Sequence, residues 1–143
     1  MRRAAIFVFV ALVACVAPAR SFGSFQGKAN ATAKDMLSAV ETARLTVQLT
    51  QRRKTFSPFI STALGETERD GDAIAGAFDS VQPPDARSDK IRSDLDQILQ
   101  LATSTLSNLR IAARRTNLVQ LTGAAKPLPA LSEQLQHFIE VNQ

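Results

Sequence analysis

The sequence contains no tryptophan and no tyrosine, and it has one cysteine and one histidine. With only eight phenylalanines as aromatic residues, it has little material for a surface that stacks nucleic-acid bases. One cysteine excludes an intramolecular disulfide and a C-x-x-C-H haem motif. The sole histidine, His137, falls opposite the apolar face of the last predicted helix, so we expect it at the surface, where it supports neither a hydrolase triad nor a metal site. These absences predict a non-enzymatic protein with no cofactor.

The charge balance also argues against a nucleic-acid partner. The chain has 17 basic and 13 acidic residues, a formal net charge of +4. Arg2 and Arg3 belong to the N-terminal segment discussed next, and removing them leaves 15 basic against 13 acidic residues, or +2. A charge so near balance does not give the broad positive surface that nucleic-acid binding requires.

The first 19 residues have the pattern of a secretory signal peptide. Arg2 and Arg3 precede an uncharged apolar run from Ala4 to Val16. This run of 13 residues is too short to cross a bilayer core as a helix, and it has the length of a signal-peptide apolar region. The sequence therefore predicts a protein that is exported out of the cytoplasm.

Two processing sites follow the apolar run. Leu12-Val13-Ala14-Cys15 resembles a bacterial lipobox, which implies cleavage before Cys15, lipidation of its thiol and attachment to the membrane. Ala17-Pro18-Ala19 matches the site of ordinary signal peptidase, which would cut after Ala19 and release a soluble secreted or periplasmic protein. Either site explains the lone thiol. We favour the lipid anchor on Cys15 and keep the soluble form as the alternative.

The remaining chain divides into a predicted linker and a run of helices. Residues 20–30 are rich in glycine, serine and polar residues, a composition typical of a flexible linker. From about Ala31, apolar residues recur at helical spacing to about Thr55. Ser57-Pro58 then ends this helix and begins the next.

Three further helical segments follow, separated by short breaks. The second runs from Pro58 to about Ser80, and the third begins near a cap at Asp85 or Ser88. The fourth follows Thr116-Asn117 and is interrupted by Gly123, Pro127 and Pro129. Short connections imply antiparallel neighbours. We therefore expect an all-α, up-down-up-down four-helix bundle over residues 31–143, with its last helix kinked or split near 123–129.

A family resemblance rests on two segments. The turn at 81–85 (Val-Gln-Pro-Pro-Asp) and the end of the third helix at 110–115 (Arg-Ile-Ala-Ala-Arg-Arg) resemble small helical envelope proteins of high-G+C bacteria, which are secreted or lipid-anchored and have no assigned function. The resemblance implies an envelope location and carries no activity.

Two features of the predicted bundle indicate a partner surface. Arg52, Arg53 and Lys54 end the first helix, and Arg114 and Arg115 end the third, so an up-down bundle places all five at one end. These cations suit an acidic partner, although cations at helix C-termini also complement the helix dipoles.

The first helix carries a second apolar stripe as well. Leu45, Leu49 and Phe56 lie opposite its main apolar face. They form either an exposed partner patch, or a face that becomes buried because the helix rotates along its length and Phe56 folds into the turn beside Phe59.

The predicted function is a helical interaction module of the cell envelope, held at the membrane surface by the lipid on Cys15. Its partner would be a protein or an anionic envelope component. Two alternatives remain open. The bundle could hold an apolar small molecule or lipid near the small residues Gly71, Ala102 and Thr105, or it could be a soluble secreted regulator.

Overall fold

A computed structural model of the chain describes residues 19–53 and 58–143. Five helices lie in these residues: α1 (Phe22–Arg53), α2 (Pro58–Asp79), α3 (Ala86–Arg114), α4 (Leu118–Ala124) and α5 (Leu128–Val141). The predictions for the signal peptide, Cys15, Lys54 and Phe56 fall outside the described residues.

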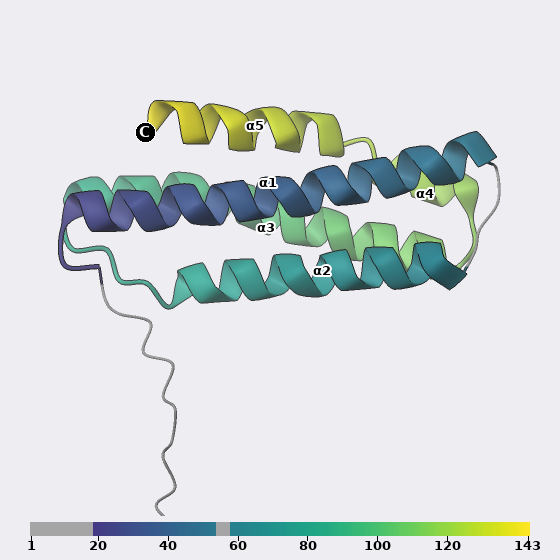
Figure 1. Ribbon diagram of the computed structural model, residues 1–143, viewed down its shortest axis with the longest axis horizontal. Coiled ribbons are helices and arrows are strands. Elements are labelled where there is room, and N and C mark those ends of the chain that lie inside the picture. The colour runs from purple at the N-terminus through teal and green to yellow at the C-terminus, as the bar shows by residue number, and fades with distance from the viewer. Residues whose placement is uncertain (1–18, 54–57) are drawn as a thin grey trace, which may run out of the picture.

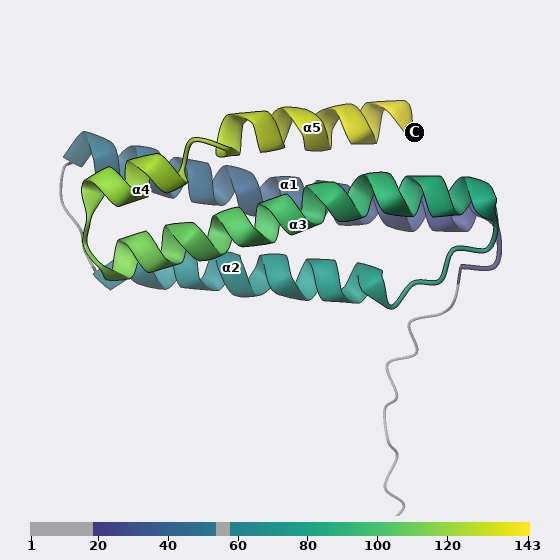
Figure 2. The ribbon, with the colours of Figure 1, turned by 180° about the vertical axis from the view of Figure 1, so that it is seen from behind.

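The helices pack as a four-helix bundle, which confirms the predicted fold. Figure 1 shows α1, α2 and α3 running in alternating directions, with α4 and α5 together forming the fourth arm. This last arm is bent by 26°. Seen from behind, α5 lies over α1 and α3 and away from α2 (Figure 2). Helix α1 contacts every other helix and is the centre of the fold.

The helices begin and end where local chemistry dictates. Pro58 is the first residue of α2, a position where a missing backbone N–H costs nothing. Asp85 is the N-cap of α3, and its side chain accepts hydrogen bonds from the Ser88 backbone N–H at 2.9 Å and hydroxyl at 2.8 Å. These two bonds hold the pKa of the Asp85 carboxyl below its usual value. Asn117 caps α4 in the same way, bonding the Gln120 N–H at 2.9 Å.

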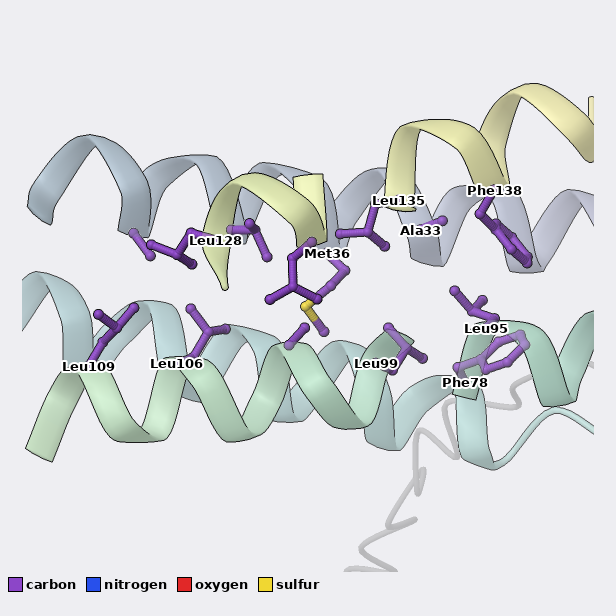
Figure 3. Close-up of a cluster of buried hydrophobic side chains, with 14 of the residues drawn as sticks. Ala33, Met36, Phe78, Leu95, Leu99, Leu106, Leu109, Leu128, Leu135 and Phe138 are labelled. Carbon is purple, nitrogen blue, oxygen red and sulfur yellow. The ribbon is translucent and has the colours of Figure 1, made fainter. Parts of the chain in front are cut away.

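The core is a single cluster of aliphatic and phenylalanine side chains. Figure 3 shows Met36 of α1 in its middle, with Leu99 and Leu106 of α3 and Leu128 and Leu135 of α5 around it. Gly71 of α2 is buried beside Met36, because α2 approaches closely at that level. An added Cβ at Gly71 would lie 2.7 Å from Leu106 Cδ1 and 3.8 Å from Met36 Sδ. The space beside this glycine is therefore filled by neighbouring side chains.

Two glycines of α2 are expected to respond oppositely to larger side chains. Gly71→Val should lower the free energy of unfolding by about 1–3 kcal/mol, because its side chain must displace Leu106 and Met36. Gly76 is exposed and an added Cβ meets nothing within 4 Å. Gly76→Ala should therefore raise stability by about 0.5–1 kcal/mol through helix propensity. Urea unfolding followed by circular dichroism measures the stability of both variants. Equal changes in stability at the two sites would contradict the close approach of Leu106 to Gly71.

The predicted linker at residues 20–30 is wrong for most of its length, because α1 begins at Phe22 and the bundle begins with it. Phe25 is 0% exposed, and its ring centroid lies 5.8 Å from that of Phe78. The Arg87 guanidinium lies 4.4 Å above the Phe22 ring. Burial of Phe25 and Ala29 outweighs the poor helix propensity of Gly23 and Gly27, which lie in the same part of α1.

Hydrogen bonds to the other end of the chain hold the same segment in place. The side chains of Gln26 and Asn30 both donate to the backbone carbonyl of Asn142, Gln26 at 2.9 Å. The start of α1 is thus joined to the end of α5 and belongs to the folded body.

Candidate functional site

Charge is divided between the two ends of the bundle. Residues 42–65 and 97–132 contain eight basic residues and no acidic residue. Apart from residues 54–57, which the structure does not describe, they form the end of α1, the start of α2, the second half of α3, all of α4 and the start of α5. These parts lie together in one half of the bundle (Figure 1). We call this half the basic end. Seven of its eight basic residues are described by the structure and give it a formal charge of +7. By comparison, residues 19–41, 66–96 and 133–143 hold 7 basic and 13 acidic residues, or −6.

Among the described residues, five arginines and lysines near the tip of the basic end are exposed. Arg52 and Arg53 form the last turn of α1, Arg114 ends α3, Arg115 is its C-cap, and Lys126 follows α4. Among the residues that the structure describes, no ion pair involves any of the five. The structure thus brings four of the five predicted cations together, and their charges are not neutralised by carboxylates of the described chain.

Basic residues further from the tip do have acidic neighbours. Arg110 pairs with Glu68, and Arg44 pairs with Glu41 at 2.8 Å. These pairs mark the border of the basic end.

At the acid-rich end, three cations are paired with carboxylates: Arg87, Lys90 and Arg92. Arg92 lies 3.5 Å from Asp96 and 3.8 Å from Asp79, and it donates to the backbone carbonyls of Val81 and Asp79. Partial burial raises the pKa of the Asp96 carboxyl, and the neighbouring Asp79 adds to this while Arg92 opposes it. Lys90 and Asp94 pair at 2.8 Å. Arg92 therefore holds the connection between α2 and α3 in a structural role.

Exposed apolar side chains gather in the basic end. Of seven large apolar side chains that are exposed in the described part of the chain, six belong to residues 42–65 and 97–132. Leu45 is 58% and Leu49 40% exposed, so these two face solvent rather than the core. Phe59, the second residue of α2, is 72% exposed, and Val119, the second residue of α4, is 82% exposed. Cations and apolar groups therefore share one surface.

A shallow groove opens on the flank of the basic end, between α1 and the turn from α4 to α5. It measures about 220 Å³. Arg44 and Lys126 line it together with the side-chain amides of Gln48 and Gln51 and the hydroxyl of Thr122. Gln51 Nε2 donates to Thr122 Oγ1 at 3.1 Å and joins its two walls. No carboxylate is among its lining residues, although Arg44 is paired with the neighbouring Glu41. The groove therefore offers hydrogen-bond donors and the charge of Lys126 to an anionic group.

A larger groove of about 520 Å³ lies between α3 and α5. Its lining includes the apolar residues Ile98, Leu101, Phe138 and Val141. His137 also lines it and is exposed to solvent, as predicted. Asp94, which pairs with Lys90, also lines it.

The level proposed for an internal apolar ligand is closed. Ala102 and Thr105 are buried, the Thr105 hydroxyl donates to the Leu101 carbonyl at 2.7 Å, and the space beside Gly71 is filled. Binding of an apolar molecule within the core at this level therefore has no support from the packing.

Two kinds of feature are absent from residues 19–53 and 58–143. No group of three or more histidine, cysteine, aspartate or glutamate side chains there is placed to hold a metal ion. No helix in the same residues combines the length and the apolar character needed to cross a membrane.

Sequence reasoning missed Lys126, Phe59 and Val119 as parts of this surface. A signal for Lys126 was present, because the absence of acidic residues over 42–65 and 97–132 can be read directly from the sequence. No periodicity marks Phe59 or Val119, since each lies in the first turn of a helix, where exposure depends on how the chain enters the bundle.

Comparison with known proteins does not assign a function. No protein-family model matches the chain, and no curated protein or solved structure matches it.

Proposed function

We propose that this protein is an exported, non-enzymatic interaction module of the cell envelope, anchored through a lipid on Cys15, and that its basic end binds an anionic partner. The observation that carries the proposal is the separation of charge among the described residues, +7 at one end of the bundle and −6 over the rest. The positive charge of the basic end attracts an anionic surface over about 8 Å at physiological salt. Because the acid-rich residues lie at the other end, they do not screen the exposed arginines.

The position of α1 supports an anchor at the end opposite the partner site. Helix α1 begins at Phe22, so seven residue steps connect it to Cys15, a reach of at most about 25 Å. Its 32 residues are about 48 Å long. A lipid on Cys15 would hold the acid-rich end close to the membrane, and the basic end would be free to meet a partner. Ala19 is buried in the core cluster. Cleavage before Cys15 keeps this residue in the mature protein, whereas cleavage after Ala19 would remove it.

The intact mass of the mature protein from membrane and soluble fractions tests the anchor. We expect a membrane-bound species that begins at Cys15 and carries two or three acyl chains. A soluble species beginning at Arg20 would remove the anchor from the proposal and favour a diffusible regulator.

Charge reversal tests the partner site. We expect Arg52→Glu/Arg114→Glu to weaken binding to isolated cell envelopes at least tenfold, because each substitution replaces attraction with repulsion at an exposed position. The matched control is Lys34→Glu/Arg69→Glu, which makes the same change of charge at exposed positions outside the basic end.

Cosedimentation with envelopes at low and at physiological salt measures both variants. If the double variant at the basic end and the control bind like the wild type, the proposed partner site is wrong. If both lose binding equally, net charge rather than this surface governs the interaction.

A further inference from the structure

We propose that the anionic partner of the basic end is a lipid bilayer that contains anionic headgroups, and that Phe59 and Val119 insert between its lipids. This inference rests on the proposed function, since it requires that the basic end is the binding surface. It goes further by naming the partner as a membrane surface rather than a soluble polymer or a protein.

The positions of the two apolar side chains favour contact with a membrane. Phe59 lies in the first turn of α2 and Val119 in the first turn of α4. Both helices begin at the end of the bundle where α1 and α3 finish with their arginines. Phe59 and Val119 are the two most exposed large apolar side chains of the described chain, at 72% and 82%. They are therefore open to a partner at the same end of the bundle as those arginines.

The surrounding charges identify the chemistry of that partner. Cations beside exposed phenylalanine, leucine and valine are the usual composition of a surface that lies in the headgroup region, where apolar groups enter the acyl boundary and cations meet lipid phosphates. A soluble polyanion needs only the cations and leaves Phe59 and Val119 in water. The combination of the two kinds of residue therefore favours a lipid surface.

The flank of the basic end can receive a headgroup. The groove between α1 and the α4–α5 turn has Arg44 and Lys126 on its walls, and it adds the amides of Gln48 and Gln51. Exposed Leu45 and Leu49 follow Arg44 on the same helix. A bundle that rests on this flank brings cations and leucines to the membrane together.

This placement is compatible with the anchor. With a lipid on Cys15 at one end and the basic end on the bilayer, the bundle lies lengthwise along the membrane. A basic surface of this kind is a common second membrane signal beside an acyl chain.

The experiment uses the full-length protein as exported, mixed with vesicles of phosphatidylcholine alone or with added phosphatidylglycerol, and separately with soluble polyphosphate. An acyl chain or apolar leader binds both kinds of vesicle. The ratio of the affinities for anionic and neutral vesicles therefore reports the contribution of the basic end. We expect at least tenfold stronger binding to the anionic vesicles. Phe59→Ser/Val119→Ser should reduce that binding about tenfold and leave polyphosphate binding unchanged.

Val141→Ser is the matched control, because Val141 is 62% exposed and lies outside the basic end. It should bind anionic vesicles like the wild type. Equal binding to neutral and anionic vesicles would overturn the lipid inference, and so would an unchanged Phe59→Ser/Val119→Ser variant. If envelope binding remains sensitive to Arg52→Glu/Arg114→Glu in that case, the proposed function stands with a polymer or a protein as partner. If envelope binding is insensitive as well, both proposals fail.

Discussion

Replacing Phe25 with alanine is expected to lower the free energy of unfolding by about 3–5 kcal/mol, the range for removing a fully buried phenylalanine. Phe25 is 0% exposed, and it packs against Phe78 of α2 beside the hydrogen bonds that join the start of α1 to Asn142. The loss is a large fraction of the 5–15 kcal/mol that holds an average domain folded. Chemical unfolding of wild type and variant measures it directly.

Phe59→Ala is the control for this experiment. It makes the same chemical change at a helical residue that is 72% exposed, so it should alter stability by no more than about 0.5 kcal/mol. A Phe25→Ala protein as stable as the Phe59→Ala protein would show that residues 22–30 are the flexible linker that their composition indicates, and that α1 begins later.

Neutralising the four arginines at the basic end is expected to weaken binding to anionic membranes about a thousandfold. Each arginine near such a surface contributes about 1 kcal/mol, so Arg52, Arg53, Arg114 and Arg115 changed together to glutamine remove about 4 kcal/mol. Because no ion pair holds these side chains to other described residues, the variant should keep its fold. Vesicle cosedimentation measures the binding, and circular dichroism shows whether the variant is folded.

The same variant distinguishes a binding role of the four arginines from a role limited to stabilising the ends of α1 and α3. If they only complement the dipoles at the ends of α1 and α3, neutralisation costs about 0.3–1 kcal/mol of stability at each helix end and leaves binding unchanged. If they form a binding surface, the change in binding is much larger than the change in stability. The ratio of the two free-energy changes therefore decides between these explanations.

Most of the fold could be predicted because local residues, such as prolines and N-caps, determine where most of its helices begin. Pro58, Asp85 and Asn117 begin α2, α3 and α4 as expected, and the interrupted segment at 123–129 separates α4 from α5. The start of α1 could not be found from composition. Gly23 and Gly27 suggest a linker, whereas Phe25, Ala29, Ala33 and Met36 continue the apolar face of the helix at steps of 4, 4 and 3 residues. Tertiary burial outweighs propensity in this turn.

The charged part of the candidate surface could be predicted from the sequence, whereas part of its apolar component could not. Charges at helix ends depend only on topology, so Arg52, Arg53, Arg114 and Arg115 could be grouped before the structure was known. The exposure of Phe59 and Val119 depends on how each helix turns toward the core, and a sequence pattern of one turn does not fix that rotation. The outward stripe of Leu45 and Leu49 was visible because it spans more than one turn.

The most direct test of the binding surface is a map of backbone amide chemical shifts as an anionic ligand, such as polyphosphate or phosphatidylglycerol micelles, is added to isotopically labelled protein. The proposal predicts that perturbed amides fall within 42–65 and 97–132, with the largest shifts near the arginines that end α1 and α3. Shifts centred on residues 66–96 or on the groove between α3 and α5, with the basic end unchanged, would contradict it.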